Sequence, residues 1–338
     1  MKNILILTNS FSGGGAERSM NILSNELLKT GHNVTLLAIN SGPPDEVRLL
    51  CEGICLERGW KSGPFGTFFS LLRFQKVVRK VQPDIVVVNC SLPELFSTFL
   101  SAKIRLIVVE HAPLPWGKRK FLGRSVRWIL NKRQATWVKV ANNLNIWSLS
   151  QVESCFIPNP VLLGKTSRQT FPISIKLKRL IYIGRLSEEK QPAVFLDLVD
   201  YFRIKSLMIG DGGLRGVLEV SALERDLPVN FLGHKQEPWS NIESGDLLIV
   251  PSAWEGDGVI VLEAVSRDIP MLISDIPSFR NFGLEESNYC KDPLKFRESI
   301  AAFQNSLELL IVSPAQSKRC LEPRNPSKVA AQWEVILK

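Results

Sequence analysis

The chain has 338 residues, of which 45% are hydrophobic and 22% charged, a composition typical of a soluble globular protein with room for two domains. No apolar run approaches the roughly 18 residues that a membrane span needs, and the apolar stretch in MKNILILTNS is too short for a signal-peptide core. The net charge of +9 is concentrated in residues 1–165, where 21 Lys/Arg stand against 10 Asp/Glu, whereas residues 166–338 hold 21 against 23. The first half is therefore expected to meet an anionic partner.

Short apolar runs alternate with amphipathic stretches, which is typical of a parallel sheet covered by helices. In the first half we expect strands at 3–8, 33–39, 84–89 and 105–110. A helical stripe between the first two strands ends at Gly31, since glycine commonly ends helices. Six cysteines show no complete zinc-site spacing, so we expect them to be reduced and mostly buried.

A stretch rich in proline, glycine and polar residues at 157–172, IPNPVLLGKTSRQTFP, is the best linker candidate. The alternation then restarts, with strands expected at 179–186, 206–212, 229–234, 246–252 and 270–275. The sequence therefore predicts two α/β domains with a cleft between them. We place them at 1–162 and 163–320, and expect 321–338 to be a C-terminal helix that packs back on the first domain.

The first strand runs into NSFSGGGAER, residues 9–18. Three glycines after a strand let the backbone approach a ligand closely, and a helix that follows presents free amides to an anion. The dinucleotide fingerprint G-x-G-x-x-G is absent. A plain strand-to-helix turn is the alternative.

Arg185 and Lys190 follow a predicted strand in YIGRLSEEKQP, and Pro192 indicates that their loop leads into a helix. A guanidinium fork with an ammonium suits a pyrophosphate group. Pairing of these cations with Glu188 and Glu189 in solvent is the alternative. The glycines of MIGDGGLRGVLE, residues 208–219, are a weaker signal of the same kind, since strand-to-helix turns often need glycine.

The segment WEGDGVIVLEA, residues 254–264, carries a carboxylate at each end. We expect Glu255 on a loop that follows the strand at 246–252, and Glu263 one or two turns into a helix. Both would border the crevice at the carboxyl ends of the strands, where open α/β sheets bind ligands. One loop acid and one helix-surface acid is the alternative.

These motifs occur together in an order that resembles family-4 glycosyltransferases, retaining enzymes of the GT-B fold that use nucleotide-activated sugars. The matching segments are IGRLSEEK, IGDGGLR, FLGH and PSAWEGDGVIVLEA, with Glu255-x7-Glu263, and in the first half GGGAER and IPNP. The resemblance spans residues 3 to 282. It implies two Rossmann-like domains whose parallel sheets face a central cleft.

The resemblance also implies roles for individual residues. Arg185 and Lys190 would hold the diphosphate, Glu263 the ribose, and Glu255 would face the donor sugar as a catalytic group. His111, at the end of the strand at 105–110, matches a histidine near the donor sugar. The remaining donor-binding positions are Gly14, Gly15, Gly256, Asp257, Gly258 and Val259.

The sequence departs from the family at Asp257, where a bulky residue is usual, and at IPSFRNFG, which lacks the usual glycines. No Asp-x-Asp pair occurs in the chain, so we expect no metal and no other cofactor.

The segment 116–140 holds eight Lys/Arg and no acid, with tryptophans and a phenylalanine interleaved. Basic residues beside aromatic ones suit an anionic bilayer surface. Nucleic-acid binding and a merely solvated helix are alternatives, and we expect no nucleic acid. The residues assigned to the membrane or acceptor are Lys118, Arg119, Lys120, Arg124, Arg127 and Trp128.

The resemblance, together with the basic segment, implies a hexosyltransferase at the cytoplasmic face of a membrane. It would move a sugar from a nucleotide diphosphate sugar to a lipid-linked or oligosaccharide acceptor, as in bacterial surface polysaccharide synthesis. A nucleotide-sugar epimerase or hydrolase of the same fold, and a non-enzymatic binding protein for lipid or nucleic acid, remain alternatives.

Overall fold

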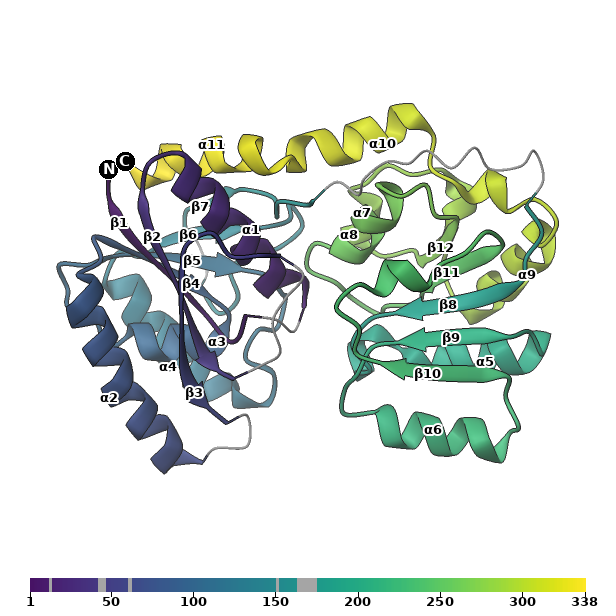
Figure 1. The fold of residues 1–338 in the computed structure, drawn as a ribbon, viewed down its shortest axis with the longest axis horizontal. Helices are drawn as coiled ribbons and strands as arrows, with labels where there is room; N and C mark the ends of the chain where they lie inside the picture. The colour runs from purple at the N-terminus through teal and green to yellow at the C-terminus, as the bar shows by residue number, and fades with distance from the viewer. Residues whose placement is uncertain (12–13, 42–46, 60–62, 150–151, 163–174) are drawn as a thin grey trace. The chain divides into compact units, whose positions relative to one another are not determined.

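A computed structural model describes residues 1–11, 14–41, 47–59, 63–149, 152–162 and 175–338 (Figure 1). The chain divides into two compact units. Unit 1 comprises Met1–Leu162 and Pro323–Lys338, and unit 2 comprises Leu163–Glu322. The predicted linker at 157–172 spans this division, and its residues from 163 onward lie outside the described ranges.

Unit 1 is built on a seven-stranded sheet in the order β3-β2-β1-β4-β5-β6-β7. Every neighbouring pair is parallel. The strands are β1 Asn3–Thr8, β2 Asn33–Asn40, β3 Glu52–Arg58, β4 Ile85–Asn89, β5 Arg105–Glu110, β6 Thr136–Lys139 and β7 Ser154–Phe156. The last two strands and β3 were not predicted from the sequence.

Helices cover both faces of this sheet. Successive β1 side chains point to opposite faces, so each face has its own apolar cluster. Ile4 and Ile6 enter one apolar cluster with α1 (Gly15–Lys29) and α11 (Pro326–Leu337). Leu5 and Leu7 enter another cluster, on the face covered by α2 (Pro64–Val81), α3 (Ser91–Ser97) and α4 (Lys120–Lys132).

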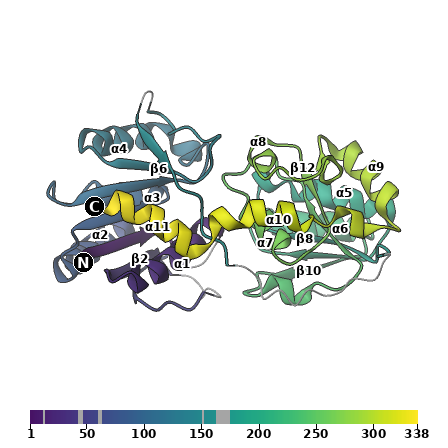
Figure 2. The same ribbon diagram turned by 90° about the horizontal axis from the view of Figure 1, so that it is seen from above.

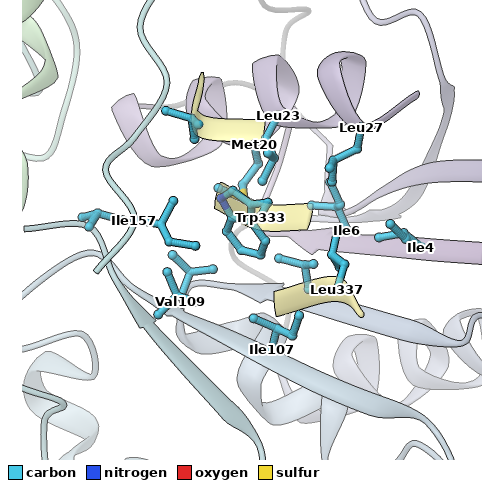
Figure 3. Packing of buried hydrophobic residues seen from close by; sticks show 14 of the residues in the cluster. Ile4, Ile6, Met20, Leu23, Leu27, Ile107, Val109, Ile157, Trp333 and Leu337 are labelled. Atoms are coloured by element: carbon cyan, nitrogen blue, oxygen red, sulfur yellow. The ribbon is translucent and has the colours of Figure 1, made fainter. Parts of the chain in front are cut away.

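Helix α11 returns the end of the chain to unit 1 and lies against α1 (Figure 2). Trp333 and Leu337 are buried with Met20, Leu23 and Leu27 (Figure 3). Removing a buried tryptophan side chain of this kind costs about 3–5 kcal/mol. The last residues of the chain are thus part of the core of its first unit.

Unit 2 contains a six-stranded parallel sheet in the order β10-β9-β8-β11-β12-β13. Its strands are β8 Arg179–Ile183, β9 Ser206–Ile209, β10 Val229–Gly233, β11 Asp246–Val250, β12 Met271–Ser274 and β13 Tyr289–Cys290. The predicted strands were at the right places but extended past the carboxyl ends of the observed ones, into the loops.

The helices of unit 2 are α5 Pro192–Phe202, α6 Arg215–Glu224, α7 Val259–Val265, α8 Pro277–Arg280, α9 Pro293–Phe303 and α10 Pro314–Leu321. The 3-10 turns in the described ranges are η1 Gly117–Arg119, η2 Glu188–Lys190, η3 Pro238–Asn241, η4 Glu286–Asn288, η5 Leu307–Leu310 and η6 Glu322–Arg324. Four of these six helices begin at a proline, and Pro192 opens α5 as the sequence predicted.

The six cysteines are free thiols. Cys290 and Cys320 are buried, but the other four are half-buried, so the expectation that most would be buried was wrong. No helix in the described ranges is both long enough and apolar enough to pass through a bilayer.

Candidate functional site

The candidate residues of unit 2 collect where its parallel strands end. Strand β8 ends at Ile183 and leads through Gly184 into the turn η2, which carries Lys190. Strand β11 ends at Val250 and leads into the loop that carries Glu255. The two loops are tied together, because the backbone N–H of Ala253 donates to the carbonyl of Glu189 at 2.8 Å. Carboxyl-end loops of this kind are where open α/β sheets bind ligands.

Lys190 and Glu255 form an ion pair across these two loops. The Glu255 side chain is buried, and it also accepts a hydrogen bond from the Ser252 hydroxyl at 2.9 Å. Ser278 donates to the Glu255 carbonyl at 2.6 Å, which holds the loop backbone. A buried carboxylate needs such partners, because an unpaired buried charge is strongly unfavourable. The glutamate is therefore held in one position beside an ammonium.

The last residue but one of β8 is a buried tyrosine, Tyr182. Burial, together with the carboxylates of Glu255 and Glu189, raises the pKa of Tyr182 far above its usual range. Its hydroxyl donates to the carbonyl of Arg185 at 2.9 Å and so fixes the loop that carries this arginine. The Arg185 side chain itself is exposed.

Two glycine loops pack against each other at this edge, which explains the G-R-L and G-D-G-G motifs structurally. Gly210 has φ +143°, and a Cβ there would lie 1.8 Å from the carbonyl oxygen of Gly184. A Cβ on Gly212 would lie 2.4 Å from the carbonyl oxygen of Leu186. Neither position can hold a side chain unless the backbone shifts. These two glycines bring the β9 loop onto the β8 loop.

Gly256, Asp257 and Gly258 continue the loop into α7, whose first residue is Val259. Gly258 has φ +63°, and a Cβ there would lie 2.6 Å from the Phe279 ring. Asp257 is buried. The short 254–258 loop is thus fixed by packing on α8.

Glu263 lies in α7, as predicted, and is also buried. Its carboxylate accepts a hydrogen bond from the indole N–H of Trp239 at 3.0 Å. The Arg267 guanidinium lies 4.9 Å from the Trp239 ring centroid and donates to the Glu263 carbonyl at 3.0 Å. Sequence reasoning missed Trp239, which lies in η3, before β11. A long-range partner of this kind leaves no local pattern.

In unit 1 the candidates also stand at the carboxyl edge of the sheet. Gly14 precedes α1 with extended backbone, and Gly15 is the first residue of that helix. Ser12 and Gly13 of the glycine motif lie outside the described residues.

His111 directly follows β5. Its Nε2 atom is buried and has no hydrogen-bond partner in the described part of the chain. Burial lowers the pKa of His111 to about 4, so the ring is neutral at neutral pH. Buried unpaired polar atoms are rare in native structures, and a ligand or water commonly accounts for them. His111 is therefore a neutral imidazole at neutral pH with one buried ring nitrogen unpaired in the described part of the chain.

The assignment of Arg127 to a membrane or acceptor surface was wrong, because its side chain is fully buried. Its Nε and Nη2 atoms donate to Glu94 at 2.9 and 2.6 Å. Its Nη1 and Nη2 atoms donate to Glu110 at 2.5 and 3.2 Å, and Nη1 also donates to the Trp147 carbonyl at 3.0 Å. The Trp116 indole donates to Glu94 at 2.8 Å.

The opposite charges in this cluster stabilise each other's ionised forms. Burial alone would lower the pKa of Arg127, but the carboxylates of Glu94 and Glu110 outweigh it and raise that pKa. Burial raises the pKa of Glu110, although Arg127 opposes the shift. The cluster joins α4 to the end of β5, one residue before His111.

The other members of the predicted surface do face solvent. Lys118, Arg119, Lys120 and Arg124 are exposed, and Trp128 is 60% exposed. Phe121, on the same helix, is 84% exposed. Among the tryptophans, Trp116 and Trp137 are buried instead. Helix α4 thus presents a mixed basic and aromatic face.

Two family models match the chain. "Glycosyltransferase Family 4" matches residues 13–142, and "Glycosyl transferases group 1" matches residues 165–320. Together they cover most of both units.

Curated relatives carry related descriptions. The chain is 23% identical over 286 residues to an Escherichia coli UDP-Gal:alpha-D-GlcNAc-diphosphoundecaprenol alpha-1,3-galactosyltransferase, covering 72% of each protein. It is 23% identical over 292 residues to a Campylobacter jejuni alpha-1,4-N-acetyl-D-galactosaminyltransferase that acts on a GalNAc-containing diNAcBac-PP-undecaprenol, covering 80% of this chain and 78% of that one.

Solved structures share the fold. Anabaena HepE in complex with UDP and glucose matches with a TM-score of 0.77 at 14% identity, covering 100% of this chain and 99% of that one. Sucrose-phosphate synthase from Thermosynechococcus elongatus matches with a TM-score of 0.76 at 15% identity, covering 99% and 98%.

Proposed function

Because the chain belongs to the family-4 type of glycosyltransferases with the GT-B fold, we propose that it transfers a hexose from a UDP-sugar to a lipid-linked acceptor with retention of anomeric configuration. The observation that carries the proposal is the contact between Lys190 and Glu255. It brings an ammonium and a buried carboxylate together at the carboxyl edge of one sheet, which supports our proposal that Lys190 contacts the diphosphate and Glu255 the sugar.

The diphosphate is the leaving group in such a transfer, so negative charge develops on its oxygens as the sugar departs. Lys190, with Arg185 on the same loop, would offset this charge. Since Lys190 is paired with Glu255 before any donor is bound, the diphosphate would share this ammonium rather than meet a free one. No metal is required for this electrostatic role, and the absence of a metal stays a prediction.

The sugar and the nucleoside would be held by the two buried glutamates. Glu255 would face the anomeric carbon and stabilise positive charge that develops on the ring. Glu263, held by Trp239, would accept hydrogen bonds from the ribose hydroxyls. For unit 1 we propose that His111, Gly14 and Gly15 contact the donor, in keeping with the buried unpaired Nε2 of the histidine.

The acceptor proposal rests on the relatives and on charge. Both curated relatives described above act on undecaprenol diphosphate-linked sugars. The exposed basic face of α4 suits an anionic bilayer, and each cation near such a surface contributes about 1 kcal/mol. We therefore place the enzyme on the cytoplasmic face of a membrane, in the synthesis of a surface polysaccharide or glycolipid.

Transfer is tested by incubating the purified protein with UDP-hexoses and a polyprenyl diphosphate-linked sugar, with the product anomer read by NMR. Arg185→Ala and Glu263→Ala should abolish turnover. The matched controls are Arg319→Ala and Glu298→Ala, which change exposed residues of the same unit. Donor conversion without acceptor would indicate an epimerase or hydrolase, and near-normal turnover in both test variants would contradict the proposal.

A further inference from the structure

Helix α2 exposes a row of large apolar side chains. Phe65 is 83% exposed, Phe68 57%, Phe69 60% and Leu72 47%. Single exposed apolar residues are ordinary, but contiguous apolar patches mark interaction surfaces.

Helical geometry gathers these residues on one side. At about 100° per residue, all four fall within an arc of about 100°. Phe74 and Val78 lie on the opposite side and are buried in the core of unit 1. The row is therefore the outer face of a well-packed helix and not a poorly packed inner face.

The charge of α2 points to one kind of partner. Arg73, Lys76, Arg79 and Lys80 are exposed on the same side, in the C-terminal half of the helix. The helix contains no acidic residue, although Lys80 reaches Glu52 at 3.1 Å. Apolar aromatic residues followed by cations form the pattern of a helix that lies in an anionic membrane surface.

Helix α4, which carries the basic face, packs on the same face of the unit 1 sheet as α2. Helices that connect parallel strands begin at the carboxyl edge of the sheet, and both α2 and α4 do so. Each has an exposed phenylalanine as its second residue, Phe65 in α2 and Phe121 in α4.

We propose that α2 is a second bilayer-docking helix, which forms with α4 one footprint for an anionic lipid surface on unit 1. The N-terminal phenylalanines of the two helices enter the bilayer deepest, and the cations of α2 meet lipid headgroups. The carboxyl edge of the sheet is thereby held at the headgroup level, where a lipid-linked sugar presents its diphosphate. This inference rests on the proposed lipid-linked acceptor.

The test is co-sedimentation of the full-length protein with two kinds of vesicle, phosphatidylcholine alone and equal parts of phosphatidylcholine and phosphatidylglycerol. The F65S/F69S variant should bind the mixed vesicles at least about tenfold more weakly than the parent, because two aromatic side chains no longer leave water. The matched control V220S/L223S removes exposed apolar residues from α6 in unit 2 and should bind as the parent does. Unfolding temperatures of all variants verify that each is folded.

Lys76→Ser combined with Arg79→Ser should weaken binding to the mixed vesicles only. Equal binding of F65S/F69S and the parent would overturn the inference. So would sedimentation velocity that shows a dimeric parent and a monomeric F65S/F69S variant, since a second copy would then cover this face. Vesicle binding is read without donor or acceptor, so failure of the transferase assay alone would affect the proposed function and not this result.

Discussion

Replacing Arg127 by methionine should destabilise unit 1 severely. The change removes the counter-charge from Glu94 and Glu110, which are both fully buried, and leaves the Trp147 carbonyl without its donor. Breaking a buried ion pair by removing one partner costs about 3–5 kcal/mol. For a unit of this size, 1 kcal/mol corresponds to about 2–4 °C in Tm, so the transition should fall by about 6–20 °C.

The assay is thermal unfolding, monitored by calorimetry and by tryptophan fluorescence. Arg124→Met is the control, because Arg124 is exposed on the same helix, and it should change stability by no more than about 0.5 kcal/mol. A carboxyl group whose folded pKa is raised stabilises the folded state in its protonated form. This contribution is lost as the pH rises through the folded pKa. Burial already raises the pKa of Glu110, so the deficit of Arg127→Met should widen as pH increases. Equal transitions for Arg127→Met and Arg124→Met would refute the cluster's role.

Three further predictions concern single residues. Folded His111 has its pKa lowered from 6.5 to about 4, so wild-type stability should fall by up to about 3 kcal/mol as pH drops through that window. In urea unfolding at a series of pH values, His111→Asn should lack this part of the pH dependence of the unfolding free energy. The same pH dependence in both proteins would count against the prediction. Trp239→Phe keeps an aromatic ring but removes the indole N–H that bonds to Glu263, so the KM for the nucleotide sugar should rise about tenfold with kcat little changed. An unaltered KM in initial-rate assays would rule this out. Gly210→Ala should cost more than about 2 kcal/mol by calorimetry, whereas Gly216→Ala, where a Cβ meets nothing within 4 Å, should be neutral or stabilising.

Buried strands were predictable because their signal is local. The runs at 3–8 and 105–110 are continuous apolar segments, and the structure has strands with these bounds. Strand β3 was missed because it is an edge strand with an unremarkable sequence, EGICLER, and β6 because it has four residues. The strand expected at 206–212 ends at Ile209, since Gly210 turns the chain with positive φ.

The placement of Arg127 needed information that composition does not contain. A run of basic residues says nothing about which side of a helix each one occupies. Periodicity held the missing signal, because Arg127 lies in register with Gly123, Val126 and Leu130, the other buried residues of α4. Its partners, Glu94 and Glu110, are 33 and 17 residues away and could be found only in the structure.

The central claim is that unit 2 holds the donor diphosphate at Lys190, and calorimetric titration with UDP and with uridine tests it most directly. Wild-type protein should bind UDP, and Lys190→Gln should weaken UDP binding at least about tenfold through loss of a charge-assisted contact. Uridine has no phosphate, so the substitution should leave uridine binding unchanged. Equal UDP affinity in wild type and Lys190→Gln would contradict the account.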